Sequence, residues 1–87
     1  VETKSSIRDD AVVILEALGG KENIQDVDAC ITRLRINLND VDKVDRETLK
    51  RLGATGVLDV PGGVQAIYGA KAILYKNEIN DILGVDD

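Results

Sequence analysis

Histidine is absent from this chain of 87 residues, and cysteine occurs once, at Cys30. A single cysteine cannot form a disulfide within the chain, and zinc sites require several cysteine or histidine ligands. The lack of histidine also excludes serine–histidine and cysteine–histidine catalytic pairs. Any chemistry must therefore use Cys30, carboxylates, hydroxyls and guanidinium groups, and we expect no metal and no cofactor.

Aromatic residues are nearly absent as well, because the chain has two tyrosines and neither phenylalanine nor tryptophan. We therefore predict an aliphatic core of valine, isoleucine, leucine and alanine. The net charge is −5, and few rings are present on which bases could stack, so the composition argues against a nucleic-acid partner. The hydrophobic content of 44% is typical of a globular domain rather than a disordered chain.

Long apolar runs are also missing. The run Ala11–Leu15 is interrupted at once by Glu16, so we expect no insertion of this chain into a membrane. No signal peptide is visible. The first residue is Val1 rather than methionine, which suggests a piece of a longer protein or a processed product. The length favours one domain.

Helical periodicity marks three segments of the sequence. Apolar side chains recur at helical spacing in residues 6–18, and again in residues 72–83 before Gly84. A third, shorter helix is predicted to follow Asp45, which has the chemistry of an N-cap, and to run to about residue 52. We expect these helices to bury one face each.

Four extended segments lie between the predicted helices. Residues 33–39 alternate strictly between apolar and polar side chains, as in a strand with one solvated face. Residues 24–29 precede them, which predicts a hairpin, although its turn at residues 30–32 lacks an Asn-Gly pair. Residues 57–60 and 64–68 flank a Pro-Gly-Gly turn.

The predicted order is helix, strand, strand, helix, strand, strand, helix. Hairpins make an antiparallel sheet, and amphipathic helices must bury their apolar faces against it. We therefore predict an α+β fold with the helices on one face of the sheet and the other face open.

The segment most suited to chemistry is Asp28-Ala29-Cys30-Ile31-Thr32-Arg33-Leu34-Arg35. If Cys30 ends one strand, then Arg33 and Arg35 share a face at the start of the next strand, near one thiol. Positive charge favours the thiolate, and the guanidinium fork matches phosphate oxygens. Thr32 adds a hydroxyl, and turn N–H groups can cradle an anion. This combination suits phosphoryl transfer through cysteine.

Each of these residues also has a purely structural interpretation. A lone cysteine in a small domain is more often a small buried hydrophobe. Arginines on the outer face of a strand are more often solvated charges, and Asp28 has the character of a turn residue. The residues alone leave the chemical and the structural interpretation open.

Three blocks of the sequence resemble the enzyme IIB (EIIB) domain of the glucose/N-acetylglucosamine family of the bacterial sugar phosphotransferase system. The segment around Cys30 resembles the phosphorylation-site signature of that family. Two further blocks agree, namely Leu52-Gly53-Ala54-Thr55-Gly56-Val57 with Gly63-Val64-Gln65-Ala66-Ile67-Tyr68-Gly69, and Ala17-Leu18-Gly19-Gly20 followed by Asn23-Ile24. The resemblance covers about residues 7–83. The loop Asp59-Val60-Pro61-Gly62 departs from the family pattern, which puts its local shape in doubt.

The resemblance implies a four-stranded antiparallel sheet with three helices on one face. Residues 1–87 would form a single EIIB domain, with residues 1–6 and 84–87 as linker ends of a larger permease on the cytoplasmic side of the cell membrane. Cys30 would accept a phosphoryl group from a phosphohistidine of the IIA domain. It would pass that group to a sugar bound by the membrane-embedded IIC domain.

The resemblance also implies roles for the neighbours of Cys30. The residues matching Arg33 and Arg35 serve the transfer to sugar in the family. By the same matching, phosphate binding is expected of Ile31, Thr32 and Gln65, with support from Asp28. The chain would then be a phosphotransferase that works through a phosphocysteine intermediate.

Three other functions compete with this interpretation. Cysteine phosphatases place their phosphate-binding arginine at a position that corresponds to Ile36 here. Thiol redox proteins use a Cys-x-x-Cys pair, and the second position of that pair is Arg33 here. A small binding or regulatory module without chemistry is the third. A phosphorylated IIA donor separates these functions, because only a carrier forms a phosphocysteine that a sugar permease can discharge.

Overall fold

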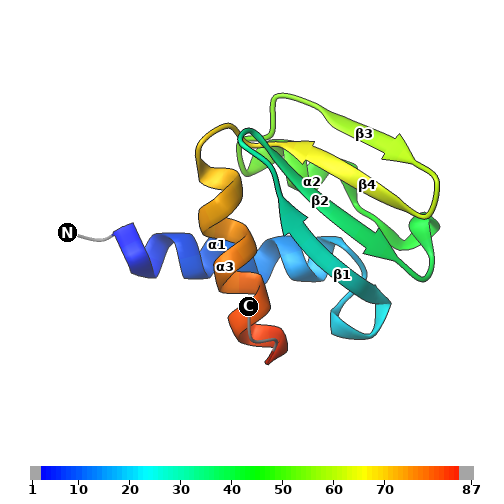
Figure 1. The fold of residues 1–87 in the computed structure, drawn as a ribbon, viewed down its shortest axis with the longest axis horizontal. Helices are drawn as coiled ribbons and strands as arrows, with labels where there is room; N and C mark the ends of the chain where they lie inside the picture. Colours follow the sequence, from blue (N-terminus) through cyan, green and yellow to red (C-terminus); the bar gives the residue numbers. More distant parts are fainter. Residues whose placement is uncertain (1–2, 85–87) are drawn as a thin grey trace.

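The computed structural model describes residues 3–84 and contains three α-helices and four strands (Figure 1). In chain order these are α1 (Thr3–Ala17), β1 (Ile24–Ala29), β2 (Arg33–Leu38), α2 (Arg46–Arg51), β3 (Val57–Val60), β4 (Gly63–Ile67) and α3 (Lys71–Leu83). The predicted element order and the α+β class are confirmed. Two short 3-10 turns that the sequence analysis did not predict, η1 (Lys21–Asn23) and η2 (Val41–Lys43), lead into β1 and α2.

The start of α1 and both ends of β4 differ from the prediction, and the other element ends agree with it to within one residue. Helix α1 begins at Thr3 rather than at residue 6, because no proline or glycine in the first turn stops the helix there. Strand β4 covers Gly63–Ile67 rather than residues 64–68. Tyr68 follows the strand end, and its backbone N–H donates to the carbonyl of Thr32, at 3.1 Å.

The four strands form one antiparallel sheet in the order β1-β2-β4-β3, with β2 and β4 in the centre. The alternation predicted for β2 is confirmed, since Leu34, Ile36 and Leu38 are buried while the residues between them are exposed. The three helices pack against the buried face. The other face stays open, and its polar side chains are available for a site.

The core contains both tyrosines, which corrects the prediction of a purely aliphatic core. Tyr68 and Tyr75 are buried, and their rings make an edge-to-face contact with centroids 4.9 Å apart. Each hydroxyl has a partner, because Tyr68 donates to the carbonyl of Leu49 and Tyr75 donates to Asp10. Burial, followed by the hydrogen bond to Asp10, raises the pKa of Tyr75 to about 12.

A buried asparagine joins the end of α1 to the connection after β2. The Asn23 side-chain amide donates to the carbonyls of Leu18 and Asp40 and accepts from the Asp40 N–H. Gly19 has φ +100°, and a Cβ there would lie 2.6 Å from the Asn23 Nδ2 atom. Only glycine fits this position. The contact with Asn23 is therefore a physical reason why Gly19 and Asn23 occur together in the block Ala17-Leu18-Gly19-Gly20 with Asn23.

Candidate functional site

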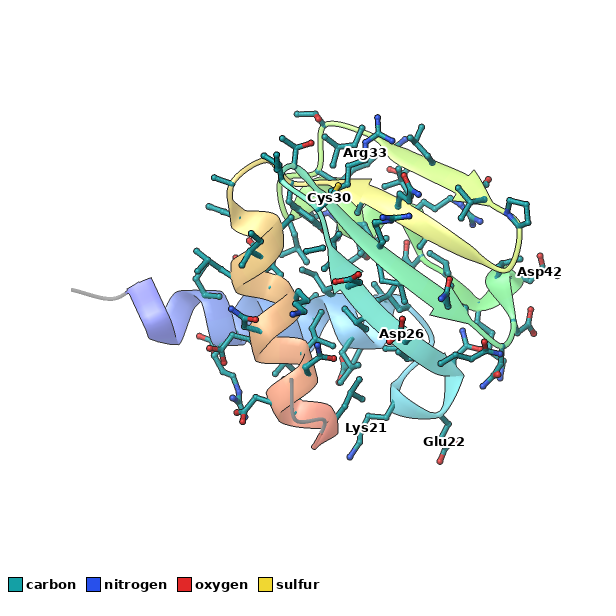
Figure 2. All side chains as sticks on the ribbon, in the orientation of Figure 1. Lys21, Glu22, Asp26, Cys30, Arg33 and Asp42 are labelled. Atoms are coloured by element: carbon teal, nitrogen blue, oxygen red, sulfur yellow. The ribbon has the colours of Figure 1, made fainter. Side chains whose placement is uncertain are left out.

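Cys30 lies at the turn of the β1–β2 hairpin, and its side chain is exposed (Figure 2). The two strands pair in register up to Ala29 and Leu34. The Cys30 N–H donates to the Arg33 carbonyl at 3.0 Å, so Ile31 and Thr32 form the corner of the hairpin. The predicted hairpin and its turn are confirmed.

Several groups next to the Cys30 thiol favour the thiolate form. Backbone N–H groups of Thr32 and Arg33 donate to the sulfur, and the charges of Arg35 and Arg33 add to their effect; together they lower the pKa of Cys30 below that of an ordinary thiol. The amides contribute more than the guanidinium charges. The turn therefore favours the thiolate form of an exposed cysteine, and the thiolate is the nucleophilic form.

The turn is held in place by the segment that follows the neighbouring strand β4. The Thr32 carbonyl accepts the N–H groups of Tyr68 and Gly69, at 3.1 and 2.9 Å. These two residues form the connection between β4 and α3. The Thr32 peptide is thus fixed by two hydrogen bonds, whereas the Ile31 side chain next to it is 83% exposed.

The predicted site residues of three strands meet on the open face at this end of the sheet. Arg33 and Arg35 both point away from the core, and Arg35 pairs in register with Asp28 on β1 and with Gln65 on β4. The Gln65 Oε1 atom accepts a hydrogen bond from Arg33 Nη1, at 3.1 Å. Figure 2 shows Cys30 and Arg33 together at this end of the sheet.

Asp28 lies close to the site, but its carboxylate accepts a hydrogen bond from the backbone of the next residue. Its Oδ1 atom accepts the N–H of Ala29, at 2.8 Å. Within residues 3–84, ion pairs join Arg8 to α3 and Arg46 to Asp59, and none joins Asp28 to Arg35. The structure therefore gives Asp28 a role in shaping the strand end before the cysteine.

Comparison with known proteins connects this hairpin to one family. The family described as phosphotransferase system, EIIB, matches residues 13–45, a segment that runs from α1 through the Cys30 hairpin. A crystal structure described as one domain of the PTS system, IIabc component from Clostridium difficile, has the same fold with a TM-score of 0.80. The alignment covers 95% of this chain and 87% of that chain, at 20% sequence identity.

Both findings support an EIIB domain. The structural neighbour shows the shared fold, and the family match adds the sequence around Cys30. The resemblance seen in the sequence is thereby confirmed, and a phosphoryl-transfer role in the sugar phosphotransferase system is supported. None of the helices within residues 3–84 is long and apolar enough to cross a membrane.

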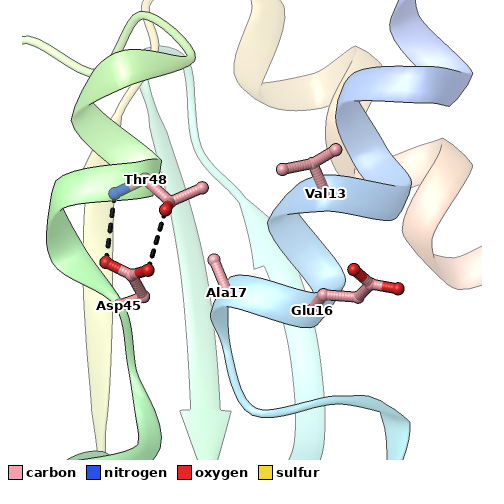
Figure 3. A pocket seen from close by; sticks show the side chains of 5 residues that line it. All are labelled: Val13, Glu16, Ala17, Asp45 and Thr48. Atoms are coloured by element: carbon pink, nitrogen blue, oxygen red, sulfur yellow. Dashed lines mark hydrogen bonds between the residues drawn. The ribbon is translucent and has the colours of Figure 1, made fainter.

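A groove of about 260 Å³ lies on the helical side of the domain (Figure 3). Its lining side chains come from α1 and from the start of α2: Val13, Glu16, Ala17, Asp45 and Thr48. Asp45 accepts hydrogen bonds from the Thr48 N–H and hydroxyl, at 3.2 and 2.8 Å, so it is the predicted N-cap of α2. The groove contains none of the predicted site residues.

Two features of the site escaped the sequence analysis. The anchoring of Thr32 by Tyr68 and Gly69 was not predicted, although both residues belong to a block that resembles the family. The contact of Gln65 with Arg33 was not predicted either, because the pairing of β2 with β4 cannot be read from their local patterns. Within residues 3–84, no three cysteine, aspartate or glutamate side chains gather as metal ligands would.

Proposed function

We propose that this EIIB domain is a phosphoryl carrier in which Cys30 accepts phosphate from a phosphohistidine of a IIA domain and delivers it to a sugar bound by a membrane IIC domain. The observation that carries the proposal is the convergence of two backbone amides and two arginines on one exposed thiol. The same groups that stabilise a thiolate also suit the oxygens of a phosphoryl group on that sulfur.

In the first transfer, the Cys30 thiolate attacks the phosphorus of the phosphohistidine. The S–P bond forms as the N–P bond breaks, and the imidazole of the donor leaves. Negative charge spreads over the three phosphoryl oxygens during this step. The N–H groups of Thr32 and Arg33 are directed toward the sulfur, so they lie beside the position of these oxygens and stabilise that charge.

In the second transfer, a hydroxyl oxygen of the sugar attacks the same phosphorus, the hydroxyl proton is released to solvent, and the S–P bond breaks. The sulfur leaves as a thiolate, and the turn amides that lower the pKa of Cys30 make it a better leaving group. Arg33 and Arg35 lie on the open face beside the cysteine. In this proposal their planar forks orient the phosphoryl oxygens toward the acceptor.

The proposed setting is a larger permease. Residues 1–87 form its EIIB domain, residues 1–6 and 84–87 lead into linkers, and the domain works on the cytoplasmic side of the membrane. Of these residues, 3–6 belong to helix α1, and residues 1–2 and 85–87 lie outside the described residues. The partners are the IIA and IIC domains, with no nucleic acid, metal or cofactor.

Reconstituted sugar phosphorylation tests this function. The phosphorylated IIA domain is mixed with membranes that contain the IIC domain and with wild-type or Cys30→Ser EIIB domain. Sugar phosphate should form with the wild type and not with Cys30→Ser, while circular dichroism shows the same fold for both. Sugar phosphate at the wild-type rate with Cys30→Ser would exclude the carrier role of Cys30.

A further inference from the structure

Gln65 contacts one of the two site arginines and not the other. In the β2–β4 register Gln65 lies directly opposite Arg35, yet its Oε1 atom accepts from Nη1 of Arg33, the diagonal neighbour, at 3.1 Å. Within residues 3–84, no side-chain hydrogen bond or ion pair holds Arg35. The two arginines are therefore held differently, although both lie on the open face of β2.

The chemistry of the contact determines how the amide is oriented. A guanidinium has donors only, so the oxygen of the glutamine amide must face it. The guanidinium is planar and its five N–H groups have a fixed arrangement. Holding Nη1 therefore selects the plane in which the remaining donors of Arg33 lie. An exposed arginine without such a contact would lose more conformational freedom when it binds a phosphoryl group.

We infer that Gln65 is a positioning residue, which holds the Arg33 guanidinium beside Cys30 rather than binding the phosphoryl group itself. This inference rests on the proposed carrier function and replaces the phosphate-binding role that the resemblance implied for Gln65. Preorganisation of a charged donor lowers the cost of reaching the transition state. Loss of Gln65 should therefore act through Arg33 and leave Arg35 unaffected.

The first test observes the contact without any phosphoryl transfer. In ¹⁵N NMR spectra of the resting domain, the side-chain NH₂ signals of Arg33 should be resolved, because the hydrogen bond slows rotation of the guanidinium. Gln65→Leu should average these signals, and Gln65→Glu, which keeps an acceptor oxygen, should keep them resolved.

The matched control is Gln25→Leu, which removes an exposed glutamine contact to Asn39 at the opposite end of the hairpin. This variant should leave the Arg33 signals unchanged. Arg33 signals that are the same in the wild type and in Gln65→Leu would overturn the inference.

The second test is a double-mutant cycle on the rate of sugar phosphorylation. Gln65→Leu alone should slow transfer by roughly three- to tenfold, the effect of one net hydrogen bond. Added to Arg33→Lys, it should slow transfer by less than about twofold, because the planar fork that the contact orients is already absent. Added to Arg35→Lys, it should keep its full effect. Gln25→Leu should have the wild-type rate.

The outcomes distinguish the positioning role of Gln65 from the carrier function of Cys30. Equal effects of Gln65→Leu in the wild-type and Arg33→Lys backgrounds would mean that Gln65 binds the phosphoryl group directly, which overturns the positioning role but keeps the carrier function. A wild-type domain that forms no phosphocysteine would overturn the carrier function and, with it, the positioning role.

Discussion

The backbone of the hairpin turn has a larger effect on the Cys30 thiol than the nearby charges. The N–H groups of Thr32 and Arg33 point to the sulfur, and the described residues other than glycine all have negative φ. The turn therefore differs from the usual tight hairpin turns, which need positive φ and favour Asn-Gly. This explains why the sequence has no Asn-Gly at a position where a hairpin was nevertheless predicted.

The reactivity of Cys30 toward iodoacetamide should show this effect. The pKa of the folded thiol is lowered, and the thiolate is the reactive form, so the alkylation rate should rise at lower pH in the folded domain than in the urea-unfolded chain. Replacing Arg33 and Arg35 together by alanine should raise the midpoint only in part, because the turn amides remain. Equal midpoints for folded and unfolded chains would contradict this account of the turn.

Arg33 and Arg35 should matter for transfer more than for folding. Both side chains lie on the open face of β2, where substitutions usually change the free energy of unfolding by less than about 0.5 kcal/mol. Lysine keeps the charge and loses the planar fork, so Arg33→Lys and Arg35→Lys should each slow sugar phosphorylation by about tenfold or more. Thermal unfolding should stay near that of the wild type. Wild-type transfer rates in both variants would show that the arginines have no such role.

The placement of these residues was predictable to different extents. Strict alternation from Arg33 onward was enough to place both arginines on one face, because side chains on a strand alternate with a period of two. The position of Gln65 next to Arg33 depends on which strands pair, and that is decided by packing between distant parts of the chain. The sequence pattern of β4 holds no information on that pairing.

At the scale of single elements, most boundaries follow from local signals. Asp45 begins α2 and Gly84, with φ +78°, ends α3, as predicted. The weak alternation of residues 24–29 has a structural cause, since a register shift between Ile24 and Asp26 leaves Gln25 as an extra residue in β1. A bulge of this kind breaks the period of two, so the pattern alone could not define this strand well.

The close approach of β4 to β2 depends on a glycine at position 63, at the start of β4. A Cβ at Gly63 would lie 2.0 Å from the carbonyl oxygen of Ile36, a backbone atom of the central strand β2. Gly63→Ala should therefore lower the free energy of unfolding by about 3 kcal/mol, at the upper end of the range for overpacking. Urea denaturation measures this change.

The control for this prediction is Gly56→Ala. There the new Cβ would meet only the end of the Ile67 side chain, at 3.6 Å, which is an ordinary contact. Its effect on the free energy of unfolding should be below about 1 kcal/mol. If both variants unfold at the same urea concentration, the close approach of β4 to β2 is not as tight as described.

For the whole molecule, the distribution of charge matters more than its sum. The net charge is −5, but two arginines outside the site are already paired, Arg8 with Glu78 and Asp81, and Arg46 with Asp59. Figure 2 shows Glu22, Asp26 and Asp42 away from the cysteine end of the sheet. Within residues 3–84 neither Arg33 nor Arg35 forms an ion pair, so we expect these two cations to give the acidic domain a local positive surface beside Cys30.

This surface should direct the docking of the IIA domain. Chemical-shift changes on addition of IIA should cluster on residues 30–35 and 63–68, with the exposed Ile31 side chain in the centre of the contact. The affinity should fall as salt rises, because exposed charges are screened. Changes concentrated on residues 76–83 of α3 would show that docking uses another face.

The central claim is that the Cys30 sulfur carries the phosphoryl group, and peptide mapping of the phosphorylated domain tests it most directly. After incubation with the general phosphotransferase proteins, a phosphoryl donor and IIA, mass spectrometry should find one added phosphoryl group, and fragmentation at a pH that preserves the S–P bond should assign it to Cys30. Cys30→Ser should gain no phosphoryl group. A phosphoryl group assigned to any other residue of the wild type, or retained in Cys30→Ser, would contradict the account.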